Sequence, residues 1–130
     1  MGDDVATYLA ANAIGTKGRT IFVGNPPANK NDFVLITDTG GSKPDQDYAL
    51  NHPSVQVAVY GSANSYTASF ALLQSIFVLL NRKQNLTIGT KDVMFVQAIS
   101  SPQVIGLDPE KNRWIMTCNF TFKIRSAEGS

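Results

Sequence analysis

The longest periodic segment of the chain runs from residue 64 to residue 83, and its apolar positions recur at the spacing of an α-helix. They form two rows, one of Tyr66, Phe70, Leu73, Phe77 and Leu80 and one of Leu72, Ile76 and Leu79. Together the rows cover about half of the circumference, more than a helix needs to pack on one sheet. We therefore expect the second row to be buried against another element or against another copy of the chain.

Alternation of apolar and polar positions, broken only by the apolar Ile115, makes residues 113–125 the clearest strand of the sequence. One face carries Trp114, Met116, Cys118, Phe120, Phe122 and Ile124, and the other carries Arg113, Thr117, Asn119, Thr121, Lys123 and Arg125. At about 3.3 Å per residue such a strand is about 40 Å long, which exceeds what one small sheet needs. We expect its ends to project toward a neighbouring molecule.

Shorter patterns divide the rest of the chain. Asp3 or Asp4 is expected to cap a short helix that ends near Gly15, and strands are expected at residues 19–24, 32–38 and 53–61. Residues 86–99 favour one strand bent near residue 89 over two short strands, and residues 106–112 favour a turn. Residues 39–52 contain paired glycines and a proline, a composition that predicts a long working loop.

This order of elements predicts an α+β fold in one domain, residues 1–130. We expect a mostly antiparallel sheet, because residues 92–125 read as a local hairpin. The sheet would pack against one long helix and a short N-terminal helix. A chain of 130 residues is long enough for one core and too short for two.

Charge and composition exclude several classes of protein. Charged residues make up only 16% of the chain and the net charge is +1, so a strongly basic nucleic-acid-binding protein is not the leading reading. The N-terminus does not resemble a secretory signal, and no apolar run is long enough to predict a membrane span. The single cysteine agrees with synthesis in a reducing cytoplasm.

Few residues suit catalysis or metal binding. His52 is the only histidine, and Cys118 lies among large apolar residues where a thiol behaves as a small hydrophobe. Asp38, Asp45 and Asp47 could hold a hard cation, although their spacing differs from that of a calcium loop and solvated loop acids are commoner. We therefore expect no catalytic residue, no cofactor and no metal site.

Arg113, Lys123 and Arg125 share the polar face of the last strand. A basic strand face could line a channel that carries DNA, contacting it by charge without sequence preference. A solvated sheet face would have the same pattern, and the sequence leaves both interpretations open.

A series of short motifs follows a characteristic order along nearly the whole chain. The motifs are residues 21–27 (IFVGNPP), 37–41 (TDTGG) with Pro44, 53–57 (PSVQV), the long helix, Gln97 with Pro102, 106–108 (GLD) and Asn119-Phe120. In this order the sequence resembles the minor capsid or tail-terminator proteins of long-tailed bacteriophages, which are small α+β proteins. Such proteins often carry an arginine before the glycine that leads into the long helix, whereas this chain has Tyr60 before Gly61.

The resemblance implies a structural virion protein rather than an enzyme. Copies would form a ring, expected to be of six, at the head-proximal end of the tail tube, stopping its growth and offering a surface to the head connector. The implied partners are the tail tube protein, a connector or head-completion protein, and DNA passing through the ring. A ring requires two different contact patches on each copy. Our candidates are Leu72, Ile76 and Leu79, in or just under the contact, and Asp38, Thr39, Gly40 and Gly41 in the loop.

Two alternatives remain open at this point. A head-completion or connector protein would use the same composition and the same kind of surface. A small thioesterase-like or ligand-binding domain would also wrap a sheet around a helix, but it would need a polar residue near the helix start, facing a cavity. Asn64, Ser65 and Thr67 suit that need only weakly.

Overall fold

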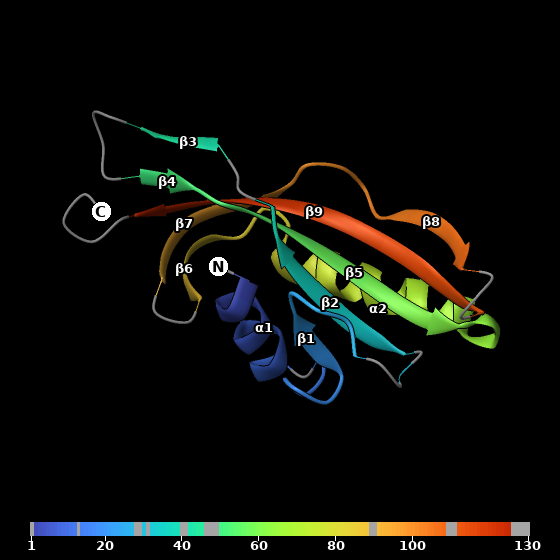
Figure 1. Ribbon diagram of the computed structural model, residues 1–130. Helices are drawn as coiled ribbons and strands as arrows, with labels where there is room; N and C mark the ends of the chain where they lie inside the picture. Colours follow the sequence, from blue (N-terminus) through green and yellow to red (C-terminus); the bar gives the residue numbers. More distant parts are fainter. Residues whose placement is uncertain are drawn as a thin grey trace.

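The computed structural model describes residues 2–12, 14–27, 30, 32–39, 42–45, 50–88, 91–108 and 112–125, and Figure 1 shows their arrangement. In chain order the elements are α1 (Gly2–Ala11), β1 (Ile21–Val23), β2 (Phe33–Asp38), β3 (Ser42–Asp45), β4 (Leu50–His52), β5 (Ser54–Ser62), the 3-10 helix η1 (Ala63–Ser65), α2 (Tyr66–Leu80), β6 (Gln84–Ile88), β7 (Lys91–Ala98), β8 (Gln103–Asp108) and β9 (Arg113–Arg125).

Strand β9 is the central strand of the sheet and pairs with four other strands. Its first residue, Arg113, pairs with Ser62 of β5 on one edge and with Asp108 of β8 on the other. Its last residue, Arg125, pairs with Leu50 of β4 and with Asp92 of β7. The predicted strand bounds are confirmed, but the expectation that its ends project is wrong, because both ends have strands on both edges.

The nine described strands form two five-stranded halves that share β9. One half has the order β1-β2-β5-β9-β8, and the other has the order β3-β4-β9-β7-β6. Among the described strands, β1 and β2 form the one parallel pair. The expected mostly antiparallel α+β fold is therefore confirmed. A strand as long as β9 is needed because it serves both halves.

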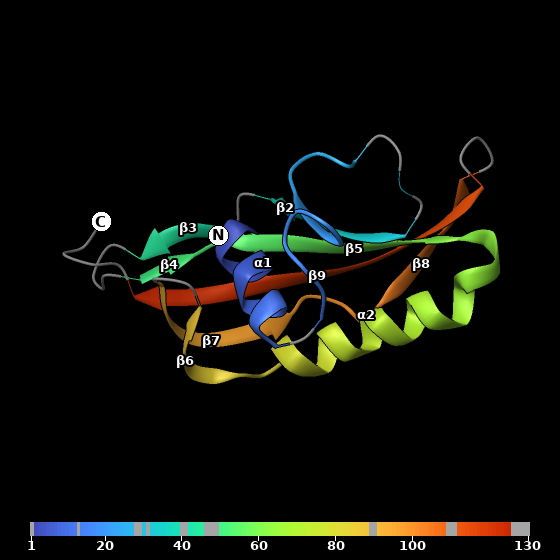
Figure 2. The same cartoon turned by 90° about the horizontal axis from the view of Figure 1, so that it is seen from below.

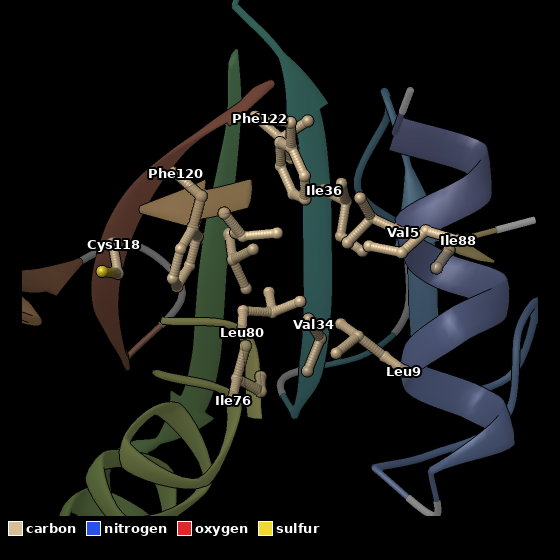
Figure 3. Close-up of a cluster of buried hydrophobic side chains, with 14 of the residues drawn as sticks. Val5, Leu9, Val34, Ile36, Ile76, Leu80, Ile88, Cys118, Phe120 and Phe122 are labelled. Carbon is tan, nitrogen blue, oxygen red and sulfur yellow. The ribbon is translucent and has the colours of Figure 1, made fainter. Parts of the chain in front are cut away.

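Both helices pack on the same face of the sheet. Val5 and Leu9 of α1 point toward Val34 of β2, and Ile76 and Leu80 of α2 approach that core from the other side (Figure 3). The acids predicted to cap α1 lie inside its first turn instead. Asp38 at the end of β2 fills the capping role, because its carboxylate accepts a hydrogen bond from the Gly2 N–H at 2.8 Å.

Helix α2 lies along the sheet with one buried face (Figure 2), and Leu73, Ile76 and Leu80 are fully buried there. Ile76 thus belongs to the core face and lies beneath the surface, whereas Leu72 and Leu79 of the same predicted row are half-buried. The segment Ala63–Leu80 is long and apolar enough to cross a bilayer by length and composition. Core helices meet the same criterion, and this one packs on β5, β7 and β9.

Three sequence-based expectations are wrong. Residues 86–99 are not one bent strand, because β6 and β7 pair antiparallel with Leu86 opposite Val93. The expected turn at residues 106–112 begins too early, since β8 pairs with β9 as far as Asp108. The expected loop at residues 39–52 contains β3 and β4, which pair with Ser42 opposite His52. In each case pairing with another strand makes the segment a regular strand, which its own composition does not indicate.

Candidate functional site

Two hollows lie on the side of α2 that faces the segment after α1. One, of about 400 Å³, is lined by Ile14 and Leu72, and the other, of about 500 Å³, is lined by Ile14, Val78 and Leu79. The exposed fraction of the Val78 side chain is 69%. We refer to Ile14, Leu72, Val78 and Leu79 as the helix groove, an apolar surface that the single chain leaves partly open to solvent.

The structure separates the two sets of predicted contact residues. Leu72 and Leu79 line the helix groove, with Ile76 beneath them. Asp38 lies instead beside Gly2, the first residue of α1. The helix separates it from the groove, and its 10 residues span about 15 Å at 1.5 Å per residue. Thr39 is exposed, and its N–H bonds to the Ser54 carbonyl at 2.9 Å. Gly40 and Gly41 lie outside the described residues.

The sheet face away from the helices carries a second, smaller apolar cluster. Its members are Phe33, Leu35 and Ala58, with Phe22 and Tyr60 packed against them. The rings of Phe33 and Tyr60 are stacked, with centroids 4.5 Å apart. Apolar side chains therefore cover this end of the face, whereas the alternation along β9 predicted a polar face there.

Arg113 is buried in this second cluster. Its guanidinium carbon lies 4.7 Å from the centroid of the Tyr60 ring and 5.4 Å from that of Phe33. Its Nη1 donates to the Lys30 carbonyl at 3.2 Å, and its Nε lies 3.9 Å from the Asp108 carboxylate. The expectation that Arg113 is displayed on a polar face is wrong, because aromatic faces and a carbonyl take up the cation.

The three basic residues of β9 do not gather into one patch. Arg113 and Arg125 stand at opposite ends of the strand, about 40 Å apart at 3.3 Å per residue. Lys123, near the second end, is half-buried. The middle of this face is polar but uncharged, with Asn119 opposite Gln56 and with Thr121 opposite Ser54 and Gln97.

A further apolar surface lies on β8, and sequence reasoning missed it. The exposed fractions of Val104, Ile105 and Leu107 are 37%, 60% and 43%, and Tyr66 at the start of α2 is 42% exposed. The Tyr66 ring meets Trp114 edge-on at 4.9 Å, and Trp114 is opposite Leu107 in the sheet. The apolar run after Pro102 could have indicated a strand, but the Gly106-Leu107-Asp108 motif favoured a turn. We refer to Tyr66, Val104, Ile105 and Leu107 as the β8 patch.

The residues that the sequence offered for catalysis or metal binding lie in ordinary structural positions. Cys118 is buried, its Sγ donates to the Ser100 carbonyl at 3.2 Å, and burial raises the pKa of its thiol to about 11. His52 lies in β4 opposite Ser42. Within the part of the chain that the structure describes, no group of three His, Cys, Asp or Glu residues could hold a metal ion. Asp47 is outside that part.

Comparisons with known proteins add to this geometry. No curated protein matches the sequence. Among the solved structures that match is a chain described as "Virion of native gene transfer agent (GTA) particle", which is 13% identical with a TM-score of 0.66. That match covers 95% of this chain and 94% of the other, and at this identity it shows a shared fold.

The family model described as "Bacteriophage tail terminator protein" matches residues 8–125. That range includes both helices in whole or in part and every described strand, and therefore also the helix groove and the β8 patch. The chain belongs to the bacteriophage tail terminator family.

Proposed function

We propose that copies of this chain form a ring of six at the head-proximal end of the phage tail tube. The ring stops growth of the tube and offers a surface to the head connector or head-completion protein. Membership of the family carries this proposal, since it makes the chain a structural protein of the phage tail. The ring, its position and its partners go beyond that membership.

The helix groove supports a contact between copies. It is apolar and partly exposed. Burying Val78 and Leu79 against another copy would lower the free energy, because their apolar surface would leave water. In the proposed ring Leu72 and Leu79 lie in the contact, with Ile76 just beneath. Asp38 and Thr39 lie toward the other end of α1. Together with Gly40 and Gly41 they remain candidates for contact with a different partner surface.

The face of the sheet away from the helices is the proposed lining of the channel. Its centre carries amide and hydroxyl groups, including Gln56 and Asn119, so phosphates would meet few fixed cations there. Lys123 and Arg125 remain the candidates for contact with DNA, at one end of the face. Arg113 serves the fold instead, because its guanidinium is buried.

Native mass measurement tests the contact. Leu72→Asp or Leu79→Asp puts a charge into the groove and is expected to abolish the ring, whereas Thr67→Asp on the exposed side of α2 is the matched control and should leave it intact. A normal ring with both groove charges present would exclude the groove as the contact.

Electron microscopy of particles that lack the protein tests its place in assembly. Tails of uncontrolled length are expected if the protein terminates the tube. Full heads without tails would instead favour the alternative, a head-to-tail joining protein.

A further inference from the structure

The β8 patch continues the hydrophobic core beyond the edge of α2. Val104 is opposite Met116 and Leu107 is opposite Trp114, so both side chains point to the face of the sheet that carries the helices. Met116 is fully buried there, while Val104 and Leu107 are exposed. Figure 1 shows β8 along the margin of the sheet, where it pairs with β9. Among the described residues, no layer covers this core-like surface.

The other margins of the described sheet are protected against contact. Ile21 of β1 uses its N–H and carbonyl in bonds to Thr16 and Gly18, at 3.0 and 2.8 Å. Strand β3 contains Pro44, which has no N–H, and Asn85 of β6 has a φ of 51° that interrupts the extended backbone. Strand β8 has no charged residue before Asp108, so it lacks the charges that usually protect an edge.

A bulge in β8 favours contact through side chains over strand pairing. The register with β9 shifts between Val104 and Gly106, and Gly106 has a φ of 149°. Ile105 has no partner residue on β9, and its side chain is 60% exposed. A bulged edge pairs poorly with another strand, whereas projecting aliphatic side chains fit an apolar groove.

The β8 patch and the helix groove lie on opposite flanks of α2. Tyr66, in the β8 patch, and Leu72, in the groove, are six residues apart and project about 120° from each other around the helix, on either side of the buried Ile76. One surface projects and the other is hollowed. Among the described lining residues, each hollow has one charged residue, Asp32 in one and Lys83 in the other, and both are exposed. The rest of the described lining is uncharged, so packing an apolar patch there would bury few charges.

We propose that the β8 patch of one copy packs into the helix groove of the next copy. The inference rests on the proposed ring and supplies its second contact patch. A contact between two different surfaces of the same chain can close into a ring, because each copy offers one surface forward and one backward. Ile105 and Leu107 are the projecting residues, and Leu72 and Leu79 receive them.

Mixing two variants tests whether the surfaces form one contact. Ile105→Asp disables the β8 patch and leaves the groove intact, and Leu79→Asp does the reverse. Each variant alone is expected to be a monomer of 14.0 kDa in native mass measurements. An equimolar mixture is expected to form a heterodimer of twice that mass and nothing larger, because one intact contact remains. Gln84→Asp, an exposed position on the margin of the other half, is the control and should form the wild-type ring.

Every other result overturns the inference. A wild-type ring from Ile105→Asp would exclude the β8 patch while leaving the ring itself standing. Monomers only in the mixture would show that the two surfaces do not meet. A wild-type chain that stays monomeric at every concentration would overturn the ring and this contact together. If Ile105→Asp fails to fold by circular dichroism, Ile105→Asn replaces it under the same expectations.

Discussion

The guanidinium carbon of Arg113 lies 4.7 Å from the centre of the Tyr60 ring, on the sheet face opposite the helices. The same side chain donates to the Lys30 carbonyl at 3.2 Å. Arg113 thus joins the first residue of β9 to β5 and to the segment before β2. In this chain Tyr60, the residue before Gly61, and Arg113 of β9 form a structural contact.

Arg113→Ala is expected to lower the free energy of unfolding by about 2 kcal/mol, the size of a desolvated cation–π contact. Arg113→Lys should recover only part of this, because an ammonium cannot match the planar guanidinium. Urea denaturation measures both. Lys123→Ala, on the same face, is the control and should change stability by less than about 0.5 kcal/mol. Wild-type stability in Arg113→Ala would disprove the structural role.

Asp38→Ala is expected to destabilise the protein by about 1 kcal/mol, because it removes the acceptor for the Gly2 N–H at the start of α1. Hydrogen exchange should quicken in α1 before other elements. The control is Thr39→Ala, an exposed neighbour whose backbone bond to Ser54 does not depend on its side chain. Unchanged exchange in α1 would count against this cap.

Gly61→Ala is expected to cost about 1–3 kcal/mol, since a Cβ at this position would lie 1.8 Å from the Ser69 Oγ. The close approach brings β5 against α2 just before the chain enters the helix. Ser69→Ala removes the clashing oxygen, so the double variant should be more stable than the sum of the single effects predicts. Strict additivity in a double-mutant cycle would refute this packing.

Cys118 should react slowly with a thiol reagent at pH 8 in the native protein and quickly once the chain unfolds. Burial raises the pKa of its thiol to about 11, so little thiolate exists below that pH. Because the unfolded thiol ionises at lower pH than the folded one, stability should fall as the pH rises toward 11. Cys118→Val should lose that component of the pH dependence. Fast labelling of the folded chain at pH 8 would contradict the burial.

Sequence patterns predict the elements whose conformation depends mainly on neighbouring residues in the chain. The alternation from Arg113 to Arg125 gives both ends of β9, and the helical spacing gives α2 within a few residues. Which face becomes buried depends on distant segments. Arg113 looks like a solvated cation in its strand, yet Phe33 and Tyr60 from two other strands cover it.

The candidate contact surfaces also depend partly on local patterns and partly on distant segments. The surplus of apolar positions on α2 indicates a second contact, and Leu72 and Leu79 do line a groove. The β8 patch could not be foreseen, because Val104 and Leu107 gain their shared face only by pairing with β9. Glycine next to Leu107 suggested a turn, whereas in the fold it marks a bulge.

The native mass of the purified wild-type chain at high concentration measures ring formation itself. We expect a closed ring, six times the 14.0 kDa chain, that persists on moderate dilution. A chain that remains a 14.0 kDa monomer at every concentration, with a small molecule bound in one of its hollows, would contradict it.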